Sequence, residues 1–201
     1  MRYLGMEWGA VKVARVYRGR GLAQAAGMFE TSRLRLRAFE EADAGPFHEW
    51  WNDAALVAWQ STGFLRPVTA AENLARLKGW VKDSLIYCCA ETLEERQLIG
   101  TVNLWGADAK NRACQLAIII GRPFWGQGFG REMVGFITRH AFVELGVHRI
   151  GLQVAAENER AIKCYRACGF REEGRQREAT WQNGRWQDEL LMGMLAGELP
   201  D

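Results

Sequence analysis

A run of closely spaced glycines, WGQGFGRE at 125–132, follows an apolar segment and precedes a segment of helical periodicity. Gly126, Gly128 and Gly130 let the backbone approach a ligand closely and present consecutive N–H groups. With the partial positive charge of a helix N-terminus, these groups form a favourable site for a phosphate or pyrophosphate, and Arg131 would add a charged contact. A plain strand-to-helix turn without a ligand explains the same glycines, so this motif alone does not decide between the two.

A second group of chemically capable residues lies in NERAIKCYRACGF at 158–170. Asn158, Ala161 and Tyr165 are three and seven residues apart, a spacing that places all three on one face of an α-helix. An amide and a phenol beside a small alanine fit a wall that lines an extended ligand. The alternative for Tyr165 is a half-buried tyrosine whose hydroxyl contacts water.

Helices and strands must position these residues. The chain has 201 residues, which is enough for one domain. Alternating or continuous apolar runs predict strands at 33–39, 84–92, 97–105, 112–121, 148–156, 170–181 and 185–194. Helical periodicity predicts helices at 41–59, 70–83, 130–145 and 158–168. Three local signals support this reading: Asp43 as an N-cap, Thr69 with Glu72 as a capping box, and the hairpin turn QNG at 182–184. The fold class is therefore a single α/β domain with a mixed sheet.

Composition narrows the function class. The chain is 48% hydrophobic and 25% charged, as in globular proteins, and it contains no apolar run of about 18 residues, so we expect no membrane span. Five cysteines without a CxxC spacing favour free thiols in a reducing, cytoplasmic compartment and argue against a metal site. The net charge is +2, but residues 1–27 carry +4 and the remainder −2. We therefore expect no nucleic-acid partner, since the main domain has no basic stripe.

Residues 1–27 form a basic, glycine-rich segment without periodicity, and we treat them as an N-terminal extension to a domain at 28–201. The segment has no continuous apolar core of the kind that secretory signals need. A transit peptide, and a true start of translation at Met28, both stay open. We expect no catalytic role for the extension.

From Thr31 to about Leu195 the sequence resembles the GNAT superfamily of acyl-CoA N-acyltransferases. Within it the likeness is greatest to the branch that acetylates ribosomal-protein N-termini (the RimJ/RimL type), spermidine and related amines. Besides EWWND at 49–53, three motifs carry the resemblance: WGQGFGRE, HRIGLQV followed by NERAIKCYRACGF, and EGRQREATWQNGRWQDELLMGML. The resemblance implies a twisted mixed sheet of about seven strands, splayed between strands 4 and 5 and flanked by about four helices.

The resemblance also implies that acetyl-CoA, as co-substrate, lies in this splay and passes its acetyl group to a primary amine of a peptide or a small molecule. The backbone of Gly126, Gln127, Gly128, Phe129, Gly130 and Arg131 would hold the pyrophosphate. Leu116, Ile118 and Ile120 would pair with the pantetheine arm, and one of their N–H groups would polarise the thioester carbonyl. Asn158 would bind the pantetheine, and Tyr165 would donate a proton to the departing thiolate. No metal is needed, and a homodimer is left open.

The general base is not assigned by the motifs. Branch members often have a glutamate and a glycine in the fourth strand, where this chain has Gln115 and Ala117. A glutamine cannot accept a proton at neutral pH. Asp188, in the last strand, is the strongest acidic candidate, followed by His148, while Glu132 is better explained as a charge at a helix N-terminus. Water relayed through backbone carbonyls explains the chemistry equally well.

Two other readings compete with an enzyme. One is a degenerate acyl-CoA-binding regulatory domain that lost catalysis with the strand-four glutamate, although the presence of Tyr165 favours the enzyme. The other is a nucleotide-phosphate site on the glycine turn, which would need a Walker-type lysine or a ribose-binding acid that this chain lacks. The tryptophans at 50, 51, 59, 181 and 186 fit either an acceptor pocket or the core.

The absence of a strand-four carboxylate predicts a preference for amines that lose their proton easily. At pH 7 an α-amine of pKa near 8 is about one-tenth free, whereas an alkylamine of pKa near 10.4 is under about 0.1% free. We expect an alanyl peptide to be acetylated faster than spermidine at pH 7, and Gln115→Glu to help spermidine selectively. Initial rates on both substrates across pH check this, and faster turnover of spermidine by the unaltered enzyme would contradict it.

Overall fold

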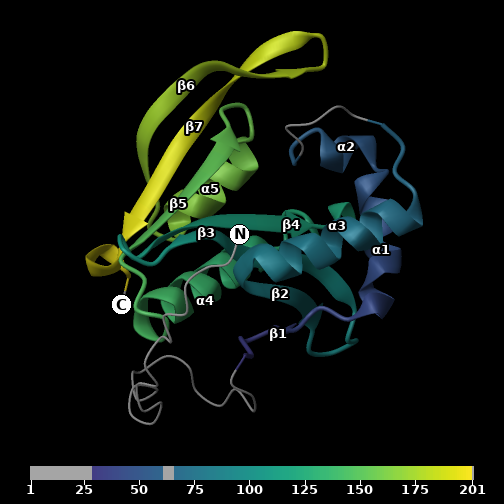
Figure 1. Cartoon of the computed structure of the whole chain (residues 1–201), viewed down its shortest axis with the longest axis horizontal. Helices are drawn as coiled ribbons and strands as arrows, with labels where there is room; N and C mark the ends of the chain where they lie inside the picture. The colour runs from purple at the N-terminus through teal and green to yellow at the C-terminus, as the bar shows by residue number, and fades with distance from the viewer. Residues whose placement is uncertain (1–28, 61–65, 201) are drawn as a thin grey trace.

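The computed structural model describes residues 29–60 and 66–200, so the extension 1–27 lies outside the described residues. The chain forms one seven-stranded sheet in the order β1-β2-β3-β4-β5-β7-β6, with helices on both faces (Figure 1). The strands are β1 (Leu34–Arg37), β2 (Ser84–Thr92), β3 (Leu98–Asp108), β4 (Ala113–Ile120), β5 (Arg149–Ala155), β6 (Arg171–Gln182) and β7 (Arg185–Leu195). The α-helices are α1 (Ala44–Trp51), α2 (Ala54–Val57), α3 (Ala70–Asp83), α4 (Phe129–Val143) and α5 (Glu159–Ala167).

The expected order of elements is confirmed, but the helix expected over 41–59 is broken. It becomes a short 3-10 turn at Glu41–Asp43, then α1 and α2, which makes five α-helices among the described residues rather than about four. The break follows from two polar side chains. The Asn52 side chain donates to the His48 carbonyl at the end of α1 and bonds both backbone groups of Val68, while Asp53 accepts from the Ala55 amide and caps α2.

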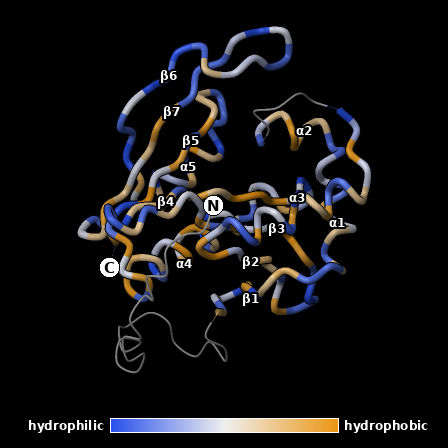
Figure 2. Tube along the Cα trace, viewed as in Figure 1, coloured by the Kyte–Doolittle hydropathy of each residue, from blue (hydrophilic) through white to orange (hydrophobic). Residues whose placement is uncertain are grey.

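Each face of the sheet covers its own hydrophobic cluster. The larger cluster lies under α4 and α5 and includes Met133, Ile137, Ile150 and Met192. The second lies under α1 and α3 and includes Phe47 and Leu77. Figure 2 shows hydrophobic residues concentrated along the central strands, whereas β6 is mostly hydrophilic and exposed. None of the helices in the described ranges is both long enough and apolar enough to cross a membrane.

The parallel pair in the middle of the sheet is short. β4 and β5 pair only from Ala113 with Arg149 to Gln115 with Gly151. Beyond Gln115, β4 continues for five residues that pair with β3 but not with β5. The expected splay between the fourth and fifth strands is therefore confirmed, and it opens toward the carboxyl ends of both strands.

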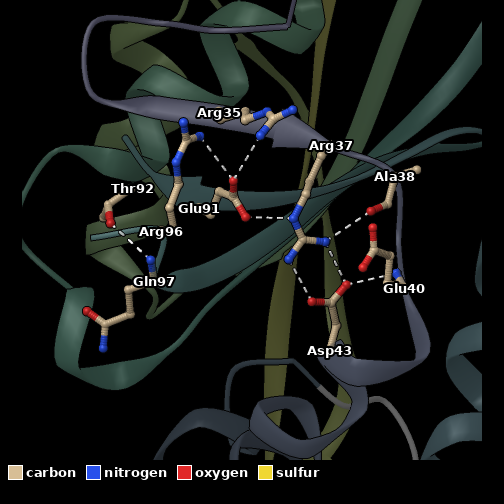
Figure 3. A network of polar contacts seen from close by, with 9 residues as sticks. All are labelled: Arg35, Arg37, Ala38, Glu40, Asp43, Glu91, Thr92, Arg96 and Gln97. Carbon is tan, nitrogen blue, oxygen red and sulfur yellow. Dashed lines mark hydrogen bonds and ion pairs between the residues drawn. The ribbon is translucent and has the colours of Figure 1, made fainter. Parts of the chain in front are cut away.

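A buried charge network ties the first strand to the rest of the domain (Figure 3). Arg37 on β1 donates to both carboxylate oxygens of Asp43, at 2.8 and 2.7 Å, and to Glu91 on β2 at 2.6 Å. Burial acts to raise the pKa of Asp43, but the hydrogen bonds from Arg37 and the Glu40 amide outweigh it and lower the pKa. Asp43 therefore does not cap α1 with its side chain, as the sequence suggested. It anchors the start of α1 to the sheet.

We predict that Asp43→Asn lowers the free energy of unfolding by about 2–4 kcal/mol at pH 7, because it leaves Arg37 with less of its compensating charge. The pKa of Asp43 is lowered in the folded state, so its contribution is complete above the ordinary pKa of 3.8 and is lost as the pH falls through the folded-state pKa. Urea unfolding at several pH values tests this. Glu41→Gln is the control, because Glu41 forms an exposed ion pair with Lys78 and should change stability by under about 0.5 kcal/mol. Equal effects of the two substitutions would contradict the role given to Asp43.

Candidate active site

A cavity of about 560 Å³ occupies the opening between β4 and β5. Its walls come from the end of α2, from β3, β4 and β5, from the glycine turn, from α5 and from the β6–β7 hairpin. Ten of the residues that the sequence assigned to a coenzyme or to proton transfer line it: Leu116, Ile118, Ile120, Gly126, Gly128, Phe129, Gly130, Arg131, Asn158 and Tyr165. The splay thus brings together motifs that are about 40 residues apart in the chain.

The glycine turn has the backbone shape that its sequence predicts. Gly126 and Gly128 have φ values of +76° and +84°, a left-handed conformation that glycine adopts with little strain. Gly128 is the N-cap of α4, and no side chain caps that helix end. The first amides of α4 therefore point to the cavity end without an intrahelical partner. Gln127 does not line the cavity, because its side chain bonds the Pro123 carbonyl.

An ion pair between Glu132 of α4 and Arg33, the residue before β1, fixes the position of the glycine turn. Glu132, in the first turn of α4, accepts hydrogen bonds from the Thr31 and Ser32 hydroxyls and from the Arg33 amide and guanidinium. Arg33 also donates to the Gln127 carbonyl at 3.0 Å. Burial alone would raise the pKa of Glu132, but these hydrogen bonds lower it. The carboxylate is thus neutralised locally and does not repel an anion bound at the turn.

Alternate residues of β4 turn their backbone groups toward the opening. Gln60 Nε2 donates to the Ile118 carbonyl at 3.1 Å, and Trp125 Nε1 donates to the Ile120 carbonyl at 2.7 Å. Side chains from outside the sheet reach these carbonyls, so they point away from the β3 ladder. In an extended strand the N–H groups of the same two residues point in the same direction. β4 therefore presents a free strand edge inside the domain.

Helix α5 forms the opposite wall. Asn158 is its N-cap and uses Oδ1 to accept from the Ala161 amide at 3.2 Å, while Nδ2 makes no hydrogen bond to a described residue. Tyr165 is 7% exposed, and its ring packs edge-on against Phe170. Burial, and then the nearby Cys164 and Cys168 thiols, raise the pKa of Tyr165, so its hydroxyl keeps its proton at neutral pH. The predicted single face of Asn158, Ala161 and Tyr165 is confirmed as a cavity wall.

Charge divides the cavity into two ends. Arg131, Arg160 and Lys163 line it beside the glycine turn and the start of α5. Glu189 on β7 lines the end formed by the hairpin, where the other polar residues are Gln153, Thr180 and Gln182. One end therefore suits an anion, and the other suits a cation.

The residues considered for the base are placed as follows. Asp188 is not among the residues that line the cavity: it accepts from Arg175 at 2.9 Å and from the Glu178 amide at 2.9 Å. These contacts lower its pKa and give it a structural task within the hairpin. His148 is exposed just before β5. Gln115 lies over Gly151, with its amide nitrogen 2.9 Å from the position that a Cβ there would take.

The tryptophans separate into three groups. Trp50 and Trp51 are buried in the second hydrophobic cluster, as the core alternative predicted. Trp59 lines the cavity, together with Trp105, which sequence reasoning did not select. Trp181 and Trp186 stack edge-to-face near the hairpin tip and are more than half exposed.

Sequence reasoning also missed Arg160, Lys163 and Glu189. Arg160 has a signal in the sequence, because it follows the helix N-cap Asn158 by two residues. In the structure its guanidinium lies 3.5 Å from the centre of the Trp125 ring. Glu189 has no such signal, because its direction depends on the register of the hairpin.

Comparison with known proteins gives consistent results. Residues 33–171 match the family described as acetyltransferase (GNAT) domain. Spermidine N(1)-acetyltransferase of Vibrio cholerae is 32% identical over 165 residues, which cover 82% of this chain and 94% of that protein. The Escherichia coli enzyme of the same name is 26% identical over 163 residues, which cover 79% and 84%. The crystal structure of the Vibrio cholerae spermidine N-acetyltransferase in complex with CoA and spermine aligns with a TM-score of 0.73 at 30% identity, covering 84% of this chain and 98% of that one.

We predict that Gly128→Val weakens binding of coenzyme A by more than tenfold, because valine resists the left-handed conformation of the turn. Isothermal titration with coenzyme A measures the effect. Gly146→Val is the matched control: Gly146 has φ +65° just beyond the other end of α4, away from the cavity. Unchanged affinity in folded Gly128→Val protein, or an equal loss in the control, would exclude the turn as the anion site.

Proposed function

Because the chain belongs to the GNAT acetyltransferase family, we propose that its cavity holds acetyl-CoA and a primary amine together, so that the amine attacks the thioester directly. The chain is an N-acetyltransferase that uses acetyl-CoA as co-substrate. The observation that carries the proposal is the cavity itself. It joins an anion-binding turn, a free strand edge and a buried tyrosine in one space.

The pyrophosphate of the coenzyme is assigned to the turn from Gly126 to Arg131. Its negative charge is favoured by the free amides at the start of α4 and by the helix dipole. Arg131 and Arg160 border the same end of the cavity. Arg160 is fixed by stacking on Trp125, which keeps a cation near the phosphates at low entropic cost.

The pantetheine arm is assigned to the free edge of β4, where its amides can bond like those of an added strand. Leu116, Ile118 and Ile120 supply the edge, and Asn158, whose Nδ2 makes no hydrogen bond to a described residue, lines the same cavity from α5. The carbonyls of Ile118 and Ile120 already accept one hydrogen bond each, and each has a second lone pair for a pantetheine amide. An N–H group on the same edge would polarise the thioester carbonyl.

Tyr165 is assigned as the general acid. When the amine nitrogen bonds to the thioester carbon and the carbon–sulfur bond breaks, the electron pair goes to sulfur and the phenol donates its proton to the thiolate. The raised pKa of Tyr165 ensures that the phenol is protonated beforehand. The presence of this residue in the cavity also speaks against a degenerate, non-catalytic domain.

The acceptor is assigned as a small primary amine, in line with the names of the spermidine acetyltransferases to which the chain is similar. A peptide N-terminus, the acceptor of the ribosomal RimJ/RimL-type branch, is the second candidate, and Gln115 is the observation that favours it. We place the enzyme in the cytoplasm, since all five cysteines are free thiols. Thiol release from acetyl-CoA with a panel of small amines and peptides tests the assignment directly.

We predict that Tyr165→Phe lowers kcat by about 10²-fold while the KM for acetyl-CoA changes less than about twofold, as expected when a general acid is lost. Steady-state kinetics with a thiol-trapping assay measures both constants. Tyr87→Phe is the control, because Tyr87 is equally buried but belongs to the second cluster, away from the cavity. A higher KM with unchanged kcat would instead assign Tyr165 to packing against the pantetheine.

A further inference from the structure

The acceptor end of the cavity is built on one face of the sheet. Side chains that lie opposite each other in neighbouring strands share a face, and so do alternate residues of one strand. Trp105 is opposite Gln115, and Gln115 is opposite Gly151. Two and four residues further along β5, Gln153 and Ala155 point to this face as well.

Glu189 joins this face from the hairpin. It lies opposite Ala155 of β5 and opposite Gln176 of β6, so both of its cross-strand neighbours are uncharged. The preceding residue, Asp188, points to the other face and is held there by Arg175. The alternation of the strand therefore sends one of two adjacent carboxylates into the cavity and the other out of it.

Glu189 is the one carboxylate among the described residues that line the cavity. It forms no ion pair with a described residue, and burial raises its pKa. The titratable or cationic side chains that share the cavity are Arg131, Arg160, Lys163, Cys164 and Tyr165. The three cations among them lie by the glycine turn and α5, and Lys163 is paired with Glu159.

We propose that Glu189 receives the ammonium group of the acceptor amine and takes up its proton before attack. This inference rests on the proposed function and assigns the base that Gln115 cannot provide. Trp59 and Trp105 line the same cavity, and aromatic faces add a favourable surface for an alkylammonium group.

The protons balance in three steps. The ammonium passes one proton to the Glu189 carboxylate and becomes a free amine. Its nitrogen then bonds to the thioester carbon, the carbon–sulfur bond breaks, and Tyr165 protonates the sulfur. The new nitrogen centre loses its second proton to the Tyr165 phenolate, and Glu189 releases its proton to solvent. The sum is an amide, coenzyme A thiol and one proton.

This assignment predicts a particular pH dependence. With Glu189 as the base, the enzyme binds the ammonium form, so kcat/KM for spermidine stays level between the pKa of Glu189 and that of the amine. It falls at low pH as the carboxylate is protonated. Without the carboxylate only free amine reacts, and kcat/KM should rise about tenfold per pH unit up to the amine pKa near 10.4.

The experiment compares Glu189→Gln with the unaltered enzyme on spermidine from pH 6 to 10. We expect a loss of about 10²-fold or more at pH 7 that shrinks toward pH 10. The loss should be smaller for glycinamide, whose amine has a lower pKa, and the KM for acetyl-CoA should not change. Glu178→Gln is the control, since it removes the same charge from the same hairpin outside the cavity. Glu189→Asp should keep the level profile at a reduced rate.

Two outcomes overturn the proposal: a Glu189→Gln profile parallel to that of the unaltered enzyme, which means an equal defect (or none) at all pH values, or the predicted change of profile in Asp188→Asn instead. Binding of coenzyme A by each variant confirms that it is folded. If the unaltered enzyme releases no thiol with any amine, the proposed function fails. If that enzyme is active but Glu189→Gln is unaffected, this inference alone fails.

Discussion

The divergence of β4 from β5 is the constraint on which the rest of the molecule depends. Three residue pairs hold the two strands together, and the five following residues of β4 have backbone groups on one side without a strand partner. Unpaired backbone groups inside a domain are costly. Gln60 and Trp125 satisfy two of the carbonyls, and the remaining groups face a cavity. The splay therefore creates a strand edge whose unpaired backbone groups can gain hydrogen bonds from a bound ligand.

The opening between β4 and β5 keeps its shape only if the neighbouring elements are held in place. Here strand β1 and the residue before it, Arg33, hold them. Arg33 and Glu132 fasten the glycine turn to β1, while Arg37 fastens β1 to α1 through Asp43 and to β2 through Glu91. These ion pairs join the turn to the helices next to the acceptor end, in addition to the packing of Phe124 and Trp125 on the second cluster. Removal of one partner from such a network costs more free energy of unfolding than the intact network contributes. We therefore infer that these charges fix the geometry of the turn more than they raise the stability of the domain.

Local signals predicted the elements well and the directions of side chains poorly. Helix α3 and strand β2 have the expected bounds, the Thr69–Glu72 capping box forms, and the Asn183-Gly184 turn closes the hairpin. The coenzyme side was predictable because glycine spacing and helical spacing determine geometry over a few residues. The acceptor side was not, because the choice between Asp188 and Glu189 depends on the register between distant strands, and a shift of one residue exchanges the faces.

The presence of Gln115, where the resemblance implies a strand-four carboxylate, is easier to understand once Glu189 is considered. Gln115 lies opposite Gly151, and Glu189 lies opposite Ala155, four residues or about 13 Å further along the same face. A carboxylate at the first position would approach the amine from the middle of the sheet, next to the closed end of the splay. One at the second position approaches from the hairpin. Gln115 restricts the enzyme to easily deprotonated amines only if no other carboxylate serves the acceptor. A base on the hairpin would remove that limit, and the length of the acceptor would then be set by the hairpin and α2 rather than by the strand that binds the coenzyme.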